Sequence, residues 1–235
     1  MSISRQNLSI VIVTFKSEAV IHKCIQSIDK EIKIIIVENS NDKEFKERIE
    51  KTYKNTTCVL SSKNLGMGSG NNMGIKKAET DFVLILNPDV IFEDNTIDKL
   101  ILASKTISDF AILAPISSDS NYPNYQIEEG KNFLSDLDSP FKVKSVDGFA
   151  MLLNKKRLDE KINKNYFDEN FFMYLENDDL CKRIRDINEN IFIVPDSKIK
   201  HLGGKAVHEK YKEEIEYSRN WHWIWSKFYF NKKHF

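Results

Sequence analysis

The strongest constraint on the fold is the alternation of apolar runs with helix-like segments over about the first hundred residues. Four runs rich in valine and isoleucine read LSIVIVTF, IKIIIVEN, TTCVLSS and FVLILN. They show little two-residue alternation, which is typical of strands covered on both faces. Between the first two runs, SEAVIHKCIQSI repeats apolar residues at helical spacing, and NDKEFKERIEKTY and GNNMGIKKAE indicate further helices. This order predicts an α/β fold with a parallel sheet and crossover helices.

The second half of the sequence is less regular. NTIDKLILASKTI indicates an amphipathic helix and AILAPI a short strand, and we expect the polar stretch 117–140 to form an irregular loop. Two further strands are predicted, at VDGFAMLLN and IFIVPDSKIKH. Between them, we expect the aromatic segment FFMYLENDDLCKRIRD to become helical towards its end. A helix is also predicted for the aromatic tail EEIEYSRNWHWIWSKFYFNKKHF. With no internal repeat and no linker, we expect one domain over 1–235.

Composition excludes several classes of protein. Hydrophobic residues make up 41% of the chain, enough to bury a core, and basic and acidic residues balance at 35 each. That balance argues against nucleic acid as the main partner. Cys24, Cys58 and Cys181 form no C-x-x-C pair, so neither a disulfide framework nor a zinc cluster is indicated. No signal peptide and no run of about 20 apolar residues is present, so we expect a cytoplasmic protein.

The residues that follow the four apolar runs are candidates for a ligand site. They are Thr14 with Phe15, Glu38 with Asn39, Ser61 and Ser62 before Asn64, and Asn87 with Asp89. In an open α/β sheet, ligands bind beyond the carboxyl ends of the strands. One polar strand end would be ordinary turn chemistry, but four neighbouring ones favour a binding site.

Asp89 is the first candidate for a metal ligand. Pro88 restricts Asn87 to extended conformations, so Asp89 would project from the edge of the strand. A carboxylate there can bind Mg²⁺ or Mn²⁺, whose other ligands would include phosphate oxygens. His201, at the end of SKIKH, would supply a second ligand or contact a phosphate. The alternatives are a simple N-P-D turn and a structural histidine.

The glycine-rich stretch NLGMGSGNNMG, residues 64–74, matches a dinucleotide-binding fingerprint only in part. Gly66 and Gly68 occupy the first two glycine positions, but Asn71 stands at the third. We expect exposed backbone N–H groups here, leading into a helix that suits an anionic or nucleotide group. A flexible loop without a binding role is the alternative.

Three acids precede the helix that carries Arg183. Glu176, Asp178 and Asp179 lie within four residues, and their mutual repulsion would raise the pKa of one carboxyl group. Such a group could accept a proton from a substrate. The alternative is that the acids only favour the positive end of the helix dipole.

The order of these motifs resembles a known family. VIVTF, VENSND, NLGMGSGNNMG, VLILNPD, GFAMLL, FFMYLENDDLCKR and KIKHLGG follow one another as in the family 2 inverting glycosyltransferases with the GT-A fold. The bacterial rhamnosyltransferase-like branch, which builds surface polysaccharides, is the most similar, and the resemblance covers about Ser9 to Gly204. It implies a Rossmann-like nucleotide-sugar-binding half at 1–100, an acceptor and catalytic half at 101–205, and an aromatic C-terminal helix at 206–235. The implied sheet is mixed but mainly parallel, with helices on its flanks.

The resemblance also implies residue roles. Thr14, Glu38 and Asn39 would hold the base and ribose, and Asn87 with Asp89 fills the place of the D-x-D metal motif. The full donor-binding set would be Thr14, Phe15, Glu38, Asn39, Asn64, Gly66, Asn72 and Asn87. The metal ligands for Mg²⁺ or Mn²⁺ would be Asp89 and His201. The base would come from Glu176, Asp178 and Asp179, with Glu176 and Asp179 favoured jointly.

Four positions depart from the family pattern. Glu38 stands where the family usually has Asp, and Asn87 replaces the first acid of the D-x-D motif. The frequent E-D-x-D pattern reads E-N-D-D, so Asn177 replaces its second acid. Ala206 stands where the family often has Ser. These departures leave the substrate and the identity of the base open.

The implied activity is that of a hexosyltransferase-type enzyme, with rhamnosyl transfer as one form. It would move a sugar from a UDP- or dTDP-sugar to a glycan or lipid-linked acceptor of the cell envelope. One alternative is a sugar nucleotidyltransferase, which would normally carry a G-x-G-T-R-type loop where this chain has TFKSEAV. The other is a non-catalytic nucleotide-sugar or glycan-binding module, which Asn177 and Ala206 keep open.

The aromatic tail has two interpretations. Trp221, Trp223 and Trp225 with neighbouring lysines could lie in a membrane interface, which would place the protein at the inner face of the plasma membrane. Alternatively, the helix packs on the sheet or on a partner subunit of an oligomer.

Overall fold

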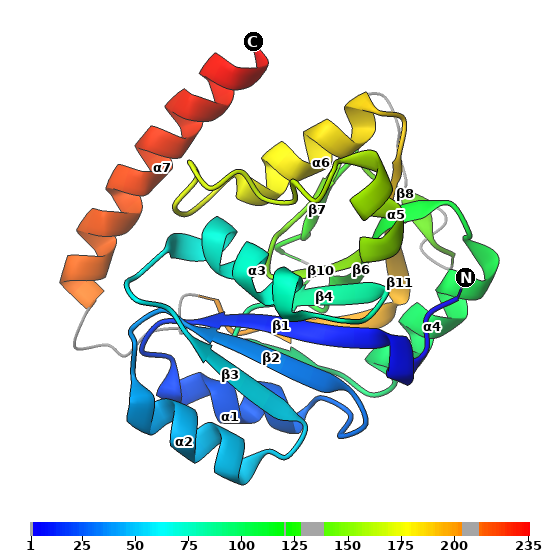
Figure 1. The fold of residues 1–235 in the computed structure, drawn as a ribbon. Helices are drawn as coiled ribbons and strands as arrows, with labels where there is room; N and C mark the ends of the chain where they lie inside the picture. Colours follow the sequence, from blue (N-terminus) through cyan, green and yellow to red (C-terminus); the bar gives the residue numbers. More distant parts are fainter. Residues whose placement is uncertain (1, 120, 128–138, 204–211) are drawn as a thin grey trace.

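The computed structural model describes residues 2–119, 121–127, 139–203 and 212–235 (Figure 1). The strands are β1 Leu8–Thr14, β2 Lys33–Glu38, β3 Thr56–Leu60, β4 Phe82–Leu86, β5 Val90–Phe92, β6 Phe110–Ser117, β7 Tyr125–Gln126, β8 Phe141–Lys142, β9 Ser145–Val146, β10 Ala150–Asn154 and β11 Asn190–His201. The helices are α1 Glu18–Gln26, α2 Lys43–Thr52, α3 Gly66–Lys77, α4 Thr96–Thr106, α5 Lys155–Lys161, α6 Glu176–Asp186 and α7 Lys212–His234, after a short 3-10 turn at Arg5–Asn7.

One nine-stranded sheet runs through the molecule. Its strand order is β3-β2-β1-β4-β10-β6-β11-β5, with β8 paired to β11, and β7 and β9 form a separate pair. The first four strands are parallel, as predicted, and β10 enters antiparallel between β4 and β6. The expectation of a mainly parallel mixed sheet is confirmed. The order of β1 to β4 changes direction at β1, which is where such sheets bind ligands.

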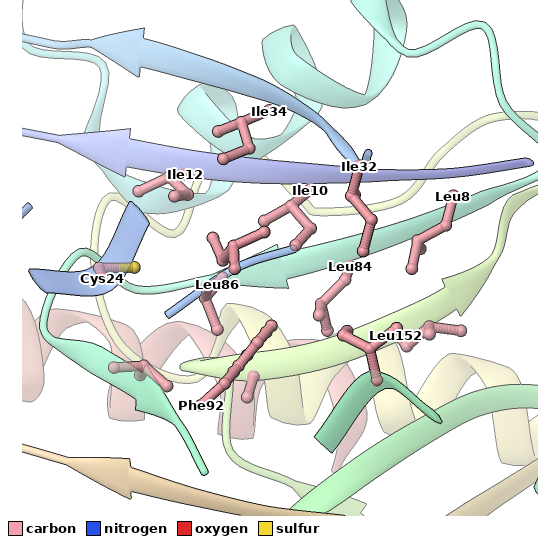
Figure 2. Close-up of a cluster of buried hydrophobic side chains, with 14 of the residues drawn as sticks. Leu8, Ile10, Ile12, Cys24, Ile32, Ile34, Leu84, Leu86, Phe92 and Leu152 are labelled. Carbon is pink, nitrogen blue, oxygen red and sulfur yellow. The ribbon is translucent and has the colours of Figure 1, made fainter. Parts of the chain in front are cut away.

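Apolar side chains cover both faces of this sheet. Along β1, Ile10 and Ile12 face a cluster formed with α1, α2 and α4, which Figure 2 shows in close-up. Val11 points to the opposite face, into a second cluster that includes residues of α3, α5 and α6. The two-residue period of a strand therefore divides one apolar run between two cores, which explains why the run shows no polar alternation.

Sequence periodicity missed several short elements, among them β5 and α5. Strand β5 has only three residues and helix α5 only seven, too few for a clear period. Within the polar stretch 117–140, the short strand β7 pairs antiparallel with β9. The short strands β5 and β7 are stabilised by pairing with strands that are distant in sequence. A local sequence pattern therefore does not predict them.

The glycines of α3 allow close packing. A Cβ on Gly74 would lie 2.3 Å from a methyl carbon of Val11, and a Cβ on Gly70 would lie 2.9 Å from one of Val13. Helix α3 therefore rests directly on β1. Gly66, with φ +78°, brings its backbone against the carbonyl of Phe172 on the other side.

We expect Gly66→Ala to lower the free energy of unfolding by about 3 kcal/mol or more. The added Cβ would lie 2.1 Å from the backbone oxygen of Phe172, so the backbone must move in addition to adopting a strained φ. Gly203→Ala is the matched control, because its φ is +57° and no atom of the described residues lies within 4 Å of an added Cβ. That variant should lose only about 1 kcal/mol. Equal losses in urea denaturation would show that the contact with Phe172 contributes nothing.

Candidate functional site

The carboxyl ends of β1 and β2 form a hydrogen-bonded edge. The hydroxyl of Thr14 donates to Glu38 Oε2 at 2.5 Å, and the other carboxylate oxygen accepts the backbone N–H of Ser40 at 2.7 Å. The N–H of Asn39 donates to the carbonyl of Thr14 at 2.8 Å. Thr14, Glu38 and Asn39 are all buried. The structure thus brings these three predicted residues together, with both oxygens of Glu38 already engaged.

Asn39 connects this edge to α3. Its amide nitrogen donates to the carbonyl of Gly66 at 2.9 Å, and its Oδ1 has no hydrogen-bond partner among the described residues. The half-buried ring of Phe15 lies beside the edge, 5.4 Å from the ammonium of Lys16. Asn39 Oδ1 is therefore a buried acceptor available to a ligand at this edge.

The prediction of exposed N–H groups at the start of α3 is wrong for the first two residues of the helix, Gly66 and Met67. The N–H of Gly66 donates to Asn64 Oδ1 at 3.1 Å, and the N–H of Met67 donates to the carbonyl of Phe172 at 2.7 Å. Gly66 and Gly68 are both buried. The first two amides of the helix therefore donate hydrogen bonds within the protein. The second of them does so because the segment before α6 packs over this end of α3.

Asn72 holds the segment that precedes α6. Its amide nitrogen donates to the carbonyl of Phe167 at 2.8 Å, and its Oδ1 accepts the N–H of the same residue at 3.0 Å. Its amide nitrogen also donates to Glu169. Asn72 borders a hollow of about 640 Å³ between α3 and residues 163–170, whose lining contains none of the other predicted site residues. Its contacts describe a positioning role.

Asp89 and His201 lie together although they are far apart in sequence. Strand β5 pairs antiparallel with β11, which brings Val90 opposite His201 and sets Asp89 Oδ1 3.4 Å from His201 Nε2. Asp89 is only 2% exposed, and its Oδ1 has no hydrogen-bond partner in the described part of the chain. The imidazole stacks on Phe149 with ring centroids 4.1 Å apart, which fixes its orientation.

This pair fits a divalent cation. A carboxylate oxygen without a hydrogen bond and an imidazole nitrogen beside it are both metal-ligand types. Asp89 and His201 would be the two protein ligands of such an ion; no group of three His, Cys, Asp or Glu side chains suited to a metal occurs among the described residues. The remaining ligands would then be water or phosphate oxygens, as is usual for Mg²⁺ sites.

Asn87 lies between this pair and the loop before β10. Its N–H donates to the carbonyl of Phe149 at 2.9 Å, and its Oδ1 has no partner among the described residues. Four buried oxygens without partners now belong to residues that the sequence selected, namely those of Asn39, Asn87, Asp89 and Glu176. Thr56 and Asn71 also carry such an oxygen. Buried acceptors are rarely left unpaired, so each of these oxygens is a candidate for a contact with a ligand.

A strained turn presents Glu176 at the start of α6. Tyr174 and Leu175 have φ values of +72° and +62°, which side chains of this size rarely adopt and which occur preferentially at functional sites. Burial raises the pKa of Glu176 to about 7. Its Oε2 is buried without a partner in the described chain. Glu176 therefore has the pKa of a general base near neutral pH.

Asp178 and Asp179 differ in their surroundings. Burial raises the pKa of Asp178, while a hydrogen bond from Ser145 opposes this shift. Asp179 is fully buried, and Arg183 Nε lies 2.8 Å from its Oδ2. Its Oδ1 lies 2.6 Å from Lys233 Nζ and 2.8 Å from His234 Nε2. Both oxygens of Asp179 are therefore occupied by basic side chains.

Sequence reasoning did not select Asp147, which lies between the acids and the metal pair. Burial raises its pKa to about 6, with the charge of Asp178 adding to this shift and that of His201 opposing it. Asp147 is therefore within electrostatic reach of both groups. The only local signal is the Asp-Gly pair after an apolar residue in VDGFAM, which by itself predicts a turn.

The backbone around Asp147 joins the two parts of the site. The carbonyl of Val146 accepts the amide nitrogen of Asn177 at 2.9 Å, while the carbonyl of Phe149 accepts the N–H of Asn87. A Cβ on Gly148 would lie 3.2 Å from the Cβ of Asn177, so the loop passes close to α6. Asn177, the departure from the family pattern, thus holds this loop. Ala206, the other departure in this half, lies outside the described residues.

We expect Lys233→Met to lower the free energy of unfolding by about 2 kcal/mol, because it leaves Asp168 and the buried Asp179 short of a cation. Lys232→Met is the matched control. Lys232 is exposed and forms no ion pair with a described residue, so this change should cost less than about 0.5 kcal/mol. The measurement is urea denaturation of both variants. Similar values for the two would contradict a structural role for the ion pairs of Asp179.

Comparison with known proteins identifies the family of this chain. The model of the family described as "Glycosyl transferase family 2" matches residues 9–183. The low-salt glycan biosynthesis hexosyltransferase Agl10 of Haloferax volcanii is 27% identical over 201 residues, which cover 79% of this chain and 64% of that protein. The rhamnosyltransferase WbbL of Escherichia coli K12 is 24% identical over 213 residues, covering 79% and 80%. This chain therefore spans somewhat less than two thirds of Agl10.

Solved structures with the same fold are glycosyltransferases. GalNAc-T7 with UDP, GalNAc and Mn²⁺ superposes with a TM-score of 0.66 at 14% identity, over 83% of this chain and 43% of that one. Staphylococcus aureus TarS in complex with UDP gives 0.61 at 18% identity, over 82% and 59%. The expected GT-A fold is thereby confirmed. Among the described residues, no helix combines the length and apolar character that a bilayer-spanning segment requires.

Proposed function

The chain belongs to glycosyl transferase family 2, and from this premise we propose that it transfers a sugar with inversion from a nucleotide-diphosphate donor to an acceptor hydroxyl. The observation that carries the proposal is the pairing of Asp89 with His201, near Asp147 and the acids of α6. The UDP bound in the structures of GalNAc-T7 and TarS supports a UDP-sugar donor. The name of WbbL supports a rhamnosyl donor instead, which would be a dTDP-sugar.

Asp89 and His201 would hold the metal ion, Mg²⁺ or Mn²⁺. When bound, the ion supplies positive charge that stabilises the departing nucleoside diphosphate. The Mn²⁺ in the GalNAc-T7 structure and the imidazole nitrogen of His201 support Mn²⁺ as the first ion to test. Asn87, whose Oδ1 lacks a partner among described residues, would bind the donor beside this pair.

Glu176 is the proposed base. Its carboxylate would accept the proton of the acceptor hydroxyl, while the acceptor oxygen forms a bond to the anomeric carbon. The bond from that carbon to the diphosphate oxygen breaks on the opposite face, so the configuration inverts. A pKa of about 7 leaves enough carboxylate at neutral pH and enough basicity to take the proton.

Asp178 and Asp179 would support this base in different ways. Asp178 is the second candidate for the proton acceptor, because burial also raises its pKa. Asp179, with basic partners on both oxygens, would instead position the first turn of α6. Asp147 would interact electrostatically with both Asp178 and His201 and so connect base and metal.

Donor recognition would use the edge formed by β1, β2 and α3. Asn39 Oδ1 is the free acceptor there, while Thr14 and Glu38 hold each other in place. Asn64 and Gly66 fix the turn that leads into α3, so they would shape the pocket through the backbone. Phe15 would lie beside the nucleotide, since it follows β1 directly.

The acceptor would be a glycan or a lipid-linked saccharide of surface polysaccharide synthesis, handled on the cytoplasmic side. The relative named for glycan biosynthesis supports this assignment. We propose one domain over 1–235, with donor binding in 1–100, acceptor and catalysis in 101–205, and an aromatic C-terminal segment in 206–235. Within that segment the helix α7 covers Lys212–His234, and residues 206–211 lie outside the described residues. The continuous sheet that pairs β4 with β10 and β5 with β11 supports that arrangement.

A thermal-shift screen of UDP-, dTDP- and GDP-sugars, each with and without Mn²⁺, tests the donor. We expect one nucleotide class to raise the melting temperature, and the shift to grow with Mn²⁺. Proton NMR of the product then reads the anomeric configuration. No shift with any nucleotide-sugar, or a product with retained configuration, would contradict the proposal.

A non-catalytic binding module is the second candidate, because Asn177 occupies a position where the family often has an acid. Donor hydrolysis separates the two functions. Slow release of the nucleoside diphosphate in Mn²⁺ supports the enzyme. Tight binding without release, across a panel of acceptors, supports the module.

A further inference from the structure

Helix α7 presents an aromatic stripe to solvent. We define the outer face of α7 as four large apolar residues at helical spacing, 57–81% exposed, together with Phe235, which directly follows the helix and is 93% exposed; the four are Tyr217, Trp221, Ile224 and Phe228. Positions four and three apart lie on one side of a helix, so these side chains form one continuous strip. An exposed apolar strip of this length indicates an interaction surface.

The opposite face of α7 is firmly attached to the body of the protein. Ser226 is fully buried and its hydroxyl donates to the carbonyl of Met173 at 2.8 Å. His222 stacks on Phe172 at 4.3 Å, and Tyr229 donates to Asp168. These contacts fix the rotation of the helix, so the outer face is directed away from the body. In Figure 1, α7 stands at the margin of the molecule, with no element on its outer side.

Charge along the C-terminal part of the outer face is positive. From Tyr217 to Phe235 the sequence contains four basic residues and no aspartate or glutamate, whereas Glu213, Glu214 and Glu216 precede this segment in α7. Lys233 is directed to the body, where it pairs with Asp168 and Asp179, so the basic residues left for the outer side are Arg219, Lys227 and Lys232. Lys227 and Lys232 are exposed beside the stripe and form no ion pair with a described residue.

We propose that the outer face of α7 docks on a membrane surface rich in anionic phospholipid. Tryptophan and phenylalanine prefer the boundary between headgroups and acyl chains, and flanking lysines are attracted to anionic headgroups. A second copy of the chain fits less well, because a symmetric contact would bring two sets of lysines together without an acid in this segment to pair with them.

Docking would also place the base near the membrane. The inner face of α7 reaches Asp179 through Lys233 and His234, in the same helical turn as Glu176. A lipid-linked acceptor would then meet the proposed base without leaving the bilayer surface. This consequence rests on the proposed function, whereas the docking itself does not.

Vesicle flotation of the full chain tests the proposal. We expect the protein to float with vesicles of phosphatidylcholine mixed with phosphatidylglycerol, and much less with phosphatidylcholine alone. Trp221→Glu combined with Phe228→Glu should weaken binding at least about tenfold. Leu102→Glu is the matched control, because Leu102 is 57% exposed on α4 and should tolerate the change without loss of binding.

Two further measurements make the result decisive. Lys227→Gln combined with Lys232→Gln should reduce the preference for anionic vesicles by about fivefold for each lysine. Circular dichroism melting checks that every variant is folded. No flotation of the wild-type chain, or equal flotation of the Trp221→Glu, Phe228→Glu protein, would overturn the proposal. The alternative is that the outer face binds a second copy of the chain. In that case the wild-type protein would not float but would be a dimer in sedimentation equilibrium, and the Trp221→Glu, Phe228→Glu protein would be a monomer.

The donor screen on the same proteins keeps the two proposals apart. If the outer face of α7 serves only in membrane docking, the Trp221→Glu, Phe228→Glu protein keeps its thermal shift with the nucleotide-sugar but no longer floats with vesicles. Flotation without any nucleotide-sugar response would leave the docking surface intact and contradict the transferase.

Discussion

Asp89→Asn should reduce kcat/KM for sugar transfer by about 10³-fold or more in the presence of Mn²⁺, with little change in melting temperature. The change removes the negative charge that would hold the cation but keeps the shape of the side chain. Because the Oδ1 of Asp89 accepts no hydrogen bond in the described structure, no such bond is lost in the fold. Loss of charge stabilisation on a leaving diphosphate is worth several kcal/mol, which corresponds to this loss of rate.

Asp94→Asn is the control for this experiment. Asp94 is exposed on the loop after β5, so it changes the net charge equally without touching the site. Its activity should stay within about twofold of wild type. Titration calorimetry with Mn²⁺ and UDP should show weaker metal binding for Asp89→Asn alone. Near-normal turnover of that variant would remove the metal role from Asp89.

Glu176→Gln should lower kcat by about 10²- to 10⁴-fold while leaving KM for the donor nearly unchanged. Glutamine keeps the size of the side chain but cannot accept the acceptor proton. Glu79→Gln is the matched control and should be neutral, because Glu79 is exposed in the loop between α3 and β4. If Glu176→Gln transfers sugar normally and Asp178→Asn does not, the base is Asp178.

The pH dependence of kcat/KM of the wild-type enzyme should also report the ionisation of Glu176. A base with a pKa of about 7 is protonated below that pH, so kcat/KM should fall as the pH decreases through 7. The residual activity of Glu176→Gln should not show this decrease below pH 7. A limb near pH 7 that persists in the variant would assign it to another group.

Stability should depend on pH in the opposite sense. The pKa of Glu176 is raised from 4.5 to about 7 by burial, so between these values the folded state binds more protons than the unfolded state. The free energy of unfolding therefore decreases as the pH rises through this range. At pH 8, Glu176→Gln should be more stable than wild type by up to roughly 3 kcal/mol, and the difference should shrink towards pH 5. Urea denaturation at the two pH values measures this.

Several features of the site can be predicted from the sequence alone. Val- and Ile-rich runs without alternation identify doubly covered strands, and their polar ends identify the binding edge, because parallel strands end at one side of a sheet. Thr14, Glu38 and Asn39 were selected in this way, and the structure joins them by hydrogen bonds. Their roles towards a donor remain predictions.

Other features depend on contacts that no local pattern records. Asp147 belongs to a turn that looks ordinary in sequence, and only the approach of Asp178 and His201 gives it an unusual pKa. Asp179 looked equivalent to Glu176, yet Lys233 and His234 from the far end of the chain occupy it. The glycines around Gly66 suggested open amides, whereas the structure uses them to pack α3 against β1 and Phe172.

The sequence by itself determined which segments would be buried, which chemistry the strand ends carry and which family the motif order resembles, since these follow from residue type and spacing along the chain. Only the tertiary structure decided which carboxylates are free and which are paired. That difference arises because a carboxylate's role depends on the charges and solvent around it, and β5 with β11, or α6 with α7, meet only when the chain is folded.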